Sequence, residues 1–139
     1  MLSSSDKKEI SEAIRLAEGQ TSGQIRVHVK KKCVEDVLAE AKKVFLKLKM
    51  HHTKKKNGVL IFIALNSRRF AILGDSGIHE KVGSSFWDET RDKMTEHFLN
   101  GRMKQGILAG VLSAGQKLKE HFPHHAGDRN ELADQVTGS

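Results

Sequence analysis

The sequence predicts an α/β fold in which a small mixed β-sheet carries helices on both faces. Segments with helical spacing of apolar residues alternate with short strand-like segments, and one helical segment lies between two strands. A strand–helix–strand unit makes its two strands parallel, whereas a short turn makes the next strand antiparallel. We therefore expect the order helix, strand, helix, strand, strand, helix, helix. We expect these elements to form one domain over residues 1–123, followed by a polar tail over residues 124–139.

A helix and a strand are expected at the start of the chain. Asp6 followed by Glu9 resembles a capping box, and apolar residues continue at helical spacing until Gly19. In residues 25–29, apolar residues alternate with polar ones, which predicts a half-buried strand. His28 would then face solvent, so we expect a surface residue there rather than a catalytic base.

A helix and a β-hairpin are expected in the centre of the chain. Residues 37–48 place apolar side chains on one face and lysines on the other, which is typical of an amphipathic helix. The run VLIFIAL, residues 59–65, is apolar throughout, as in a strand covered on both faces. After a turn, residues 70–73 predict its antiparallel partner.

Two helices are expected after the hairpin. Residues 87–98 carry apolar side chains at helical spacing. Residues 107–122 form the last periodic segment, which Pro123 ends. Gly106 and Gly110 are small residues four positions apart, which favours close packing of this helix on the sheet.

The charge of the chain is positive and uneven. The net charge is +7, and residues 26–56 contain eleven basic side chains against three acidic ones. Such a surface permits binding to an acidic protein, an anionic lipid or nucleic acid. Nucleic acid is the disfavoured partner, because tyrosine is absent and no aromatic residues are interleaved with the lysines. A solvated face without a partner is the alternative.

Cysteine content and hydropathy indicate the compartment. Cys33 is the single cysteine and can form no internal disulfide, which suits a reducing compartment. No apolar stretch approaches the ~20 residues of a membrane span. We therefore expect a cytoplasmic protein without a membrane span; the sequence does not indicate an oligomeric state.

Asp75 is the main candidate for a functional residue. It follows the strand predicted at residues 70–73, within the stretch Gly74-Asp75-Ser76-Gly77. Aspartate is common in turns, where its side chain accepts hydrogen bonds from backbone amides. The ends of strands in α/β sheets are also common ligand sites. Both interpretations, a turn residue and a ligand, stay open.

Further carboxylates follow on the next predicted helix. Asp88, Asp92 and Glu96 lie four residues apart on one line, where like charges repel. A divalent cation would offset that repulsion, because hard cations bind carboxylate and carbonyl oxygens. The spacing is compatible with a divalent cation beside this helix, but it matches no specific metal-binding motif. Spacing identifies no catalytic residue.

Five stretches together resemble the TPM domain family: AEGQTSGQIRVHV (17–29), NGVLIFIAL (57–65), RRFAILGDSGIHEKVG (68–83), FWDETRDKMTEHF (86–98) and GILAGVLSAGQKLKEHFP (106–123). NELADQV (130–136) is similar to the end of short, soluble bacterial members. The resemblance implies a three-layer α/β/α sandwich. Asp75 matches the acidic position of the family's G-D-x-G turn, whereas Gln24 stands where an acidic residue is common.

Two functions follow from this resemblance and from the charge distribution. Family members are linked to divalent-cation binding, often of calcium, and some are described as acid phosphatases. This implies a cation-binding domain with weak phosphomonoesterase activity, in which the metal would polarise a phosphoryl oxygen. With this resemblance we expect a Ca²⁺ or Mg²⁺ site with Asp75, Asp88 and Asp92 as metal ligands, and Ser76 and Gly77 as backbone donors. Other members are assembly or repair factors. The alternative is therefore a non-enzymatic interaction module that uses the basic face of residues 26–56.

Overall fold

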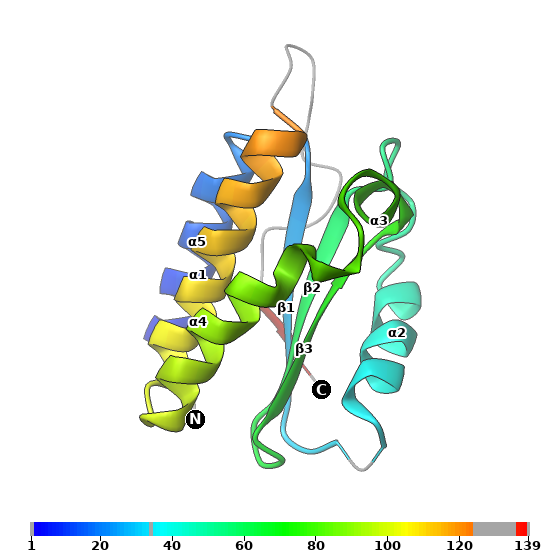
Figure 1. Ribbon diagram of the computed structural model, residues 1–139. Coiled ribbons are helices and arrows are strands. Elements are labelled where there is room, and N and C mark those ends of the chain that lie inside the picture. The colour runs from blue at the N-terminus through cyan, green and yellow to red at the C-terminus, as the bar shows by residue number, and fades with distance from the viewer. Residues whose placement is uncertain (1, 34, 124–135, 139) are drawn as a thin grey trace.

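A four-stranded mixed sheet forms the middle of three layers (Figure 1). The computed structural model describes residues 2–33, 35–123 and 136–138. The strand order is β3-β2-β1-β4. β1 is parallel to β2 and β4, and β2 is antiparallel to β3. The strands are β1 (Gln24–Lys30), β2 (Gly58–Ala64), β3 (Arg69–Gly74) and β4 (Val136–Gly138). The α/β fold with a small mixed sheet is confirmed.

Helices cover both faces of this sheet. The helices α1 (Ser4–Glu18), α4 (Asp88–Leu99) and α5 (Met103–His121) lie on one face, and α2 (Val37–Lys47) lies on the other (Figure 1). The short helix α3 (Ser76–Val82) and the 3₁₀ turn η1 (Ser84–Trp87) lead from β3 to α4. Among the described residues, no helix is both long and apolar enough to cross a membrane.

β2 contributes to two hydrophobic cores, one on each side of the sheet. Val59, Ile61 and Ile63 pack in the core beneath α1, α4 and α5. Leu60 and Phe62, together with Ala64, pack in the core beneath α2. Successive side chains of a strand point to opposite faces, so an uninterrupted apolar run is required where both faces are covered. This confirms the interpretation of VLIFIAL as a strand buried on both faces.

β1 is also buried on both faces, so the prediction that its polar face meets solvent is wrong. His28 is only 7% exposed and stacks on Phe62, with 5.9 Å between ring centroids. At the end of the strand, Lys30 forms an ion pair of 2.7 Å with Glu40 of α2. Burial, followed by the nearby charge of Arg26, lowers the pKa of His28. The contacts of His28 with β2 and of Lys30 with α2 therefore cover polar side chains that local alternation assigns to solvent.

The start of α1 differs from the predicted capping box. Ser3 is the N-cap residue, and its hydroxyl accepts a hydrogen bond from the amide of Asp6 at 3.0 Å. The Asp6 carboxylate accepts in turn from the Ser3 amide at 3.1 Å. Asp6 therefore occupies the third helical position of the box rather than the cap, because a serine three residues earlier competes for the capping role.

The two glycines of α5 pack against a helix and not against the sheet. A Cβ atom on Gly106 would lie 2.3 Å from the Phe98 ring, and one on Gly110 would lie 2.6 Å from the sulfur of Met94. Both neighbours belong to α4. The expectation of close packing is confirmed, but the expected partner was wrong: α5 lies in one layer with α4.

Three short elements, α3, η1 and β4, were not predicted. α3 begins at Ser76, where a turn was expected, and β4 lies within the segment expected to be a polar tail. Val136 pairs with Val27 in the register of β1 and β4. The residues between Pro123 and Val136 lie outside the described part of the chain.

Candidate functional site

Three segments distant in the sequence meet where β3 ends and where β1 and β2 begin. The amide of Asp75 donates to the carbonyl oxygen of Gly58 at 2.9 Å. The amide of Gln24 donates to the carbonyl oxygen of Asn57 at 3.3 Å, and the Asn57 side chain donates to Ser22 at 3.2 Å. Antiparallel pairing of β2 with β3 and parallel pairing of β1 with β2 bring these ends to one edge.

Asp75 caps α3 through one of its two carboxylate oxygens. One oxygen, Oδ1, accepts a hydrogen bond from the Ser76 amide at 2.7 Å. The other oxygen, Oδ2, is buried and has no hydrogen-bond partner in the described structure. Buried polar atoms without partners are rare in native proteins and commonly mark a bound water or ion. Asp75 is therefore a helix cap, as the turn interpretation held, and also keeps one oxygen available for a ligand.

The loop of residues 50–57 lies directly against the start of α3. The Gly77 amide donates to the carbonyl oxygen of Lys56 at 2.8 Å. A Cβ atom on Gly77 would lie 2.2 Å from the carbonyl oxygen of Lys55. Lys56 adopts a left-handed backbone conformation with φ of 51°, which is uncommon for a residue with a side chain. These contacts place two backbone carbonyl groups beside the helix that Asp75 caps.

Two further buried oxygens, one at this edge and one in the adjoining loop, have no hydrogen-bond partner in the described residues. Gln24, the first residue of β1, is 3% exposed, and its Oε1 is unpaired. Thr53, in the loop of residues 50–57, is 2% exposed, and its Oγ1 is unpaired. Together with Asp75 Oδ2, they are oxygen donors of the kind that Ca²⁺ and Mg²⁺ prefer. Thr53 was not predicted, because nothing in the local sequence shows that its loop approaches the sheet.

The other predicted ligands lie on exposed positions. Asp88 and Asp92 are exposed on α4, and Asp88 forms an ion pair of 2.9 Å with Arg91. Ser76 is exposed and donates its amide to Asp75. Over the described ranges, no three side chains of histidine, cysteine, aspartate or glutamate lie together as a metal-binding group. A cation at Asp75 would therefore draw most of its ligands from neutral oxygens.

The electrostatic surroundings of Asp75 are mixed. Lys54, Lys55 and Lys56 are exposed in the loop that approaches α3. Their positive charges disfavour a cation nearby, although water and salt screen exposed charges strongly. The same charges favour an anion that bridges a cation and the lysines, as a phosphate group can.

Comparisons with known proteins agree with this architecture. The family model of the TPM domain matches residues 1–117. The chain is 42% identical to the BA42 protein of the psychrophilic bacterium Bizionia argentinensis, whose NMR structure superposes with a TM-score of 0.94 over 100% of this chain and 96% of that one. A comparison with curated proteins gives no match.

Two more distant NMR structures share the fold. The N-terminal domain of a protein from P. gingivalis has a TM-score of 0.70 at 20% identity, covering 89% of this chain and 82% of that one. The N-terminal domain of the cg2496 protein from Corynebacterium glutamicum has a TM-score of 0.68 at 17% identity, covering 90% and 85%. At these identities the likeness concerns the fold alone.

Proposed function

This chain belongs to the TPM domain family, and from that premise we propose that it binds a divalent cation at the junction of β3 and α3. The observation that carries the proposal is the buried, unpaired Oδ2 atom of Asp75. The carboxylate would be the one charged ligand, and the oxygens of Gln24 and Thr53 and the backbone carbonyls of residues 55–56 would be neutral donors. A site with so few charges is expected to bind weakly, because affinity for Ca²⁺ rises with the number of charged ligands.

The test is a titration of Ca²⁺, and then of Mg²⁺, into ¹⁵N-labelled protein. Saturable amide shifts are expected at residues 53–58 and 74–78. Asp75→Asn should abolish them, because an amide removes the charge but still caps the helix. Glu12→Gln changes the net charge equally at an exposed position of α1 and should bind as the wild type does. Amide shifts of the wild-type protein that do not change with added Ca²⁺ or Mg²⁺ would refute the proposal.

The same experiment decides the roles of the two aspartates on α4. The sequence predicts Asp88 and Asp92 as additional ligands. If they bind the cation directly, Asp88→Asn or Asp92→Asn should weaken affinity at least tenfold, since each removes a charged ligand. If they act only through their distant charge, each variant should change affinity less than about twofold, since exposed charges are screened.

Phosphomonoester hydrolysis is a further step of this proposal. The metal would polarise a phosphoryl oxygen, and the exposed lysines of the loop could bind the remaining phosphate oxygens. Hydrolysis of a generic phosphomonoester with Ca²⁺, Mg²⁺ or Mn²⁺ should be lost in Asp75→Asn. Equal rates in the wild type and in Asp75→Asn would remove the phosphatase activity from the proposal while leaving cation binding intact.

A non-enzymatic interaction module is the second candidate, and the lysines around α2 favour it. Two basic residues of the segment 26–56 are neutralised within it, by the pairs Lys30–Glu40 and Lys43–Glu35. Further exposed lysines lie on α2 and its flanking loops and form a basic surface: Lys31, Lys32, Lys42, Lys47, Lys49, Lys54, Lys55 and Lys56. An acidic protein is the partner that this surface fits.

The charge of this surface provides the test. Binding to an acidic partner should fall steeply between low and physiological salt, and reversing the charges of residues 54–56 to glutamate should abolish it. Binding that survives this charge reversal would exclude the basic surface as the contact.

A further inference from the structure

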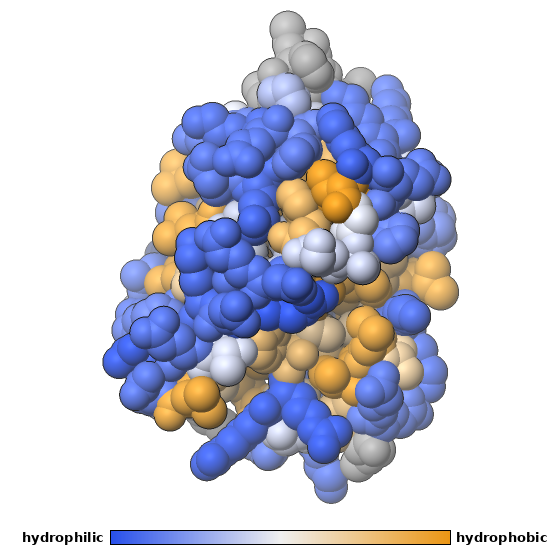
Figure 2. All heavy atoms as spheres, viewed as in Figure 1, coloured by the Kyte–Doolittle hydropathy of each residue, from blue (hydrophilic) through white to orange (hydrophobic). Residues whose placement is uncertain are grey.

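A cavity of about 480 Å³ lies between α4 and the β2–β3 hairpin. It is found at the hairpin end of β3, whereas Asp75 follows the opposite end of that strand, on the order of 17 Å away for five residues of strand. Figure 2 shows apolar side chains recessed between α4 and the hairpin on a face that is otherwise mostly hydrophilic. The cavity is therefore separate from the candidate cation site.

The walls of the cavity are apolar and held in place. Phe70 and Phe98 meet edge to face, with 5.2 Å between ring centroids. The Phe98 ring also lies against Gly106, where a Cβ atom would approach it to 2.3 Å, so the ring fits only because this residue is glycine. Met103 and Leu99 complete the wall, and Leu99 is 82% exposed. Leu99 therefore extends the apolar lining of the cavity out to solvent, where a bound apolar ligand would contact it.

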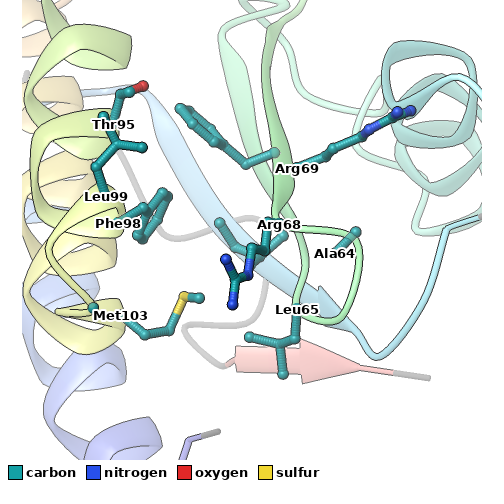
Figure 3. Close-up of a pocket in the computed structure, with 11 residues that line it drawn as sticks. Ala64, Leu65, Arg68, Arg69, Thr95, Phe98, Leu99 and Met103 are labelled. Atoms are coloured by element: carbon teal, nitrogen blue, oxygen red, sulfur yellow. The ribbon is translucent and has the colours of Figure 1, made fainter.

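Arg68 supplies a positive charge at this cavity. Its side chain points across the cavity towards Met103, whereas Arg69 points away towards α2 (Figure 3). The cavity lining contains no carboxylate, and none of the described acidic residues forms an ion pair with Arg68. The guanidinium group is thus available to an anionic group of a ligand.

The hairpin turn holds Arg68 in a left-handed backbone conformation. Arg68 lies in the hairpin turn with φ of 51°, a left-handed conformation that glycine or asparagine adopts more easily. Lys49 and Lys56 share this conformation, so the inference depends on the cavity and on the charge at Arg68 rather than on the backbone alone. Here the side chain that occupies this position is the cationic group facing the cavity.

We infer that this cavity binds a small anionic amphiphile, with an acidic head group on Arg68 and a linear apolar tail along Phe70, Phe98 and Leu99. A volume of a few hundred cubic ångströms, with apolar walls and few polar groups, is typical of small-molecule sites. Carboxylate and phosphate head groups share the required chemistry, since arginine binds either through paired hydrogen bonds.

The test is a titration of the full chain with decanoate and with decyl phosphate below micelle-forming concentrations, followed by amide shifts. Saturable shifts are expected at residues 63–70 and 95–103. Decanoate should bind about 15-fold more tightly than octanoate, because each buried methylene contributes about fourfold. The tighter of the two decyl ligands identifies the head group. Equal affinity for inorganic phosphate alone, or for decyltrimethylammonium, would overturn the proposal.

Variants separate the head-group contact from the apolar wall. Arg68→Gly suits the backbone of the turn and should weaken decanoate binding about tenfold. Arg69 also borders the cavity, but its side chain points away towards α2, so Arg69→Gln removes the same charge and should change affinity less than about twofold. Leu99→Ser, at an exposed position, should weaken both decyl ligands. Unchanged decanoate affinity in Arg68→Gly would show that the guanidinium group has no role and would refute the inference.

Discussion

The amide of Gly77 and the carbonyl oxygen of Lys56 form a 2.8 Å hydrogen bond that joins the first turn of α3 to the loop of residues 50–57. A Cβ atom on residue 77 would lie 2.6 Å from that same oxygen. The helix and the loop can approach this closely only because residue 77 has no side chain. The position of the backbone carbonyls near Asp75 therefore depends on one glycine.

Replacing Gly77 with alanine should destabilise the fold and weaken the cation site together. The added methyl group must displace backbone oxygens rather than a flexible side chain, so we expect a loss of about 1–3 kcal/mol in the free energy of unfolding. Denaturant unfolding measures this loss, and a Ca²⁺ titration measures the site. Ser76→Ala, at the exposed neighbouring position, is the control and should change stability by less than about 0.5 kcal/mol.

Lys54→Gln should strengthen cation binding. Lys54 is exposed in the loop that faces α3, so its removal lowers the positive potential without affecting the packing. We expect about twofold tighter Ca²⁺ binding at low salt and no difference at high salt, because mobile ions screen exposed charges. Lys42→Gln, on α2, is the matched control. Weaker binding in Lys54→Gln would contradict a cation site beside this loop.

His28 should make the fold less stable as the pH falls. Burial, followed by the charge of Arg26, lowers its pKa below the usual 6.5, so the unfolded chain binds a proton more readily than the folded one. The contribution is complete above about pH 6.5 and decreases as the pH falls through the lowered pKa. Urea unfolding between about pH 7 and pH 5 should show a shallower pH dependence for His28→Gln than for the wild type. The same pH dependence in His28→Gln and in the wild type would contradict a contribution from His28.

Lys49→Gly should stabilise the fold. Lys49 follows α2 with φ of 57°, and its amide donates to Leu46 at 3.0 Å while the next amide donates to Phe45 at 3.1 Å. This is a Schellman ending, in which glycine is preferred at the left-handed position. We expect a gain of about 1 kcal/mol in the free energy of unfolding. Lys42→Gly, at an exposed position inside α2, should instead lose about 1 kcal/mol, and a loss in both variants would contradict the assignment.

The long elements could be predicted from the sequence because their patterns are local. Helical spacing locates α1, α2, α4 and α5, and the apolar run of residues 59–65 correctly indicates a strand covered on both faces. The short elements could not be predicted. α3 has seven residues, and β4 has three, which is too few for a period to be visible.

The candidate site could be predicted only in part for the same reason. Asp75 was identified because it stands at the end of an apolar strand. The contact of Gly77 with Lys56 and the burial of Thr53 depend on a loop that folds back across the sheet edge, which no local pattern reports. The position of His28 likewise involves a separate element, because its ring stacks on Phe62 of β2. What the sequence lacks here is long-range contact information.

The pairing of β4 with β1 bears on the order in which the strands assemble. Val27 and Val136 are register partners although 109 positions separate them, whereas Val27 and Ile61 are only 34 positions apart. Closing the longer loop costs about 1 kcal/mol more in chain entropy. We therefore expect the hairpin of β2 and β3 to form early, β1 to join it, and β4 to dock last. In hydrogen exchange, the amides of β1 that face β4 should become accessible to solvent before those that face β2.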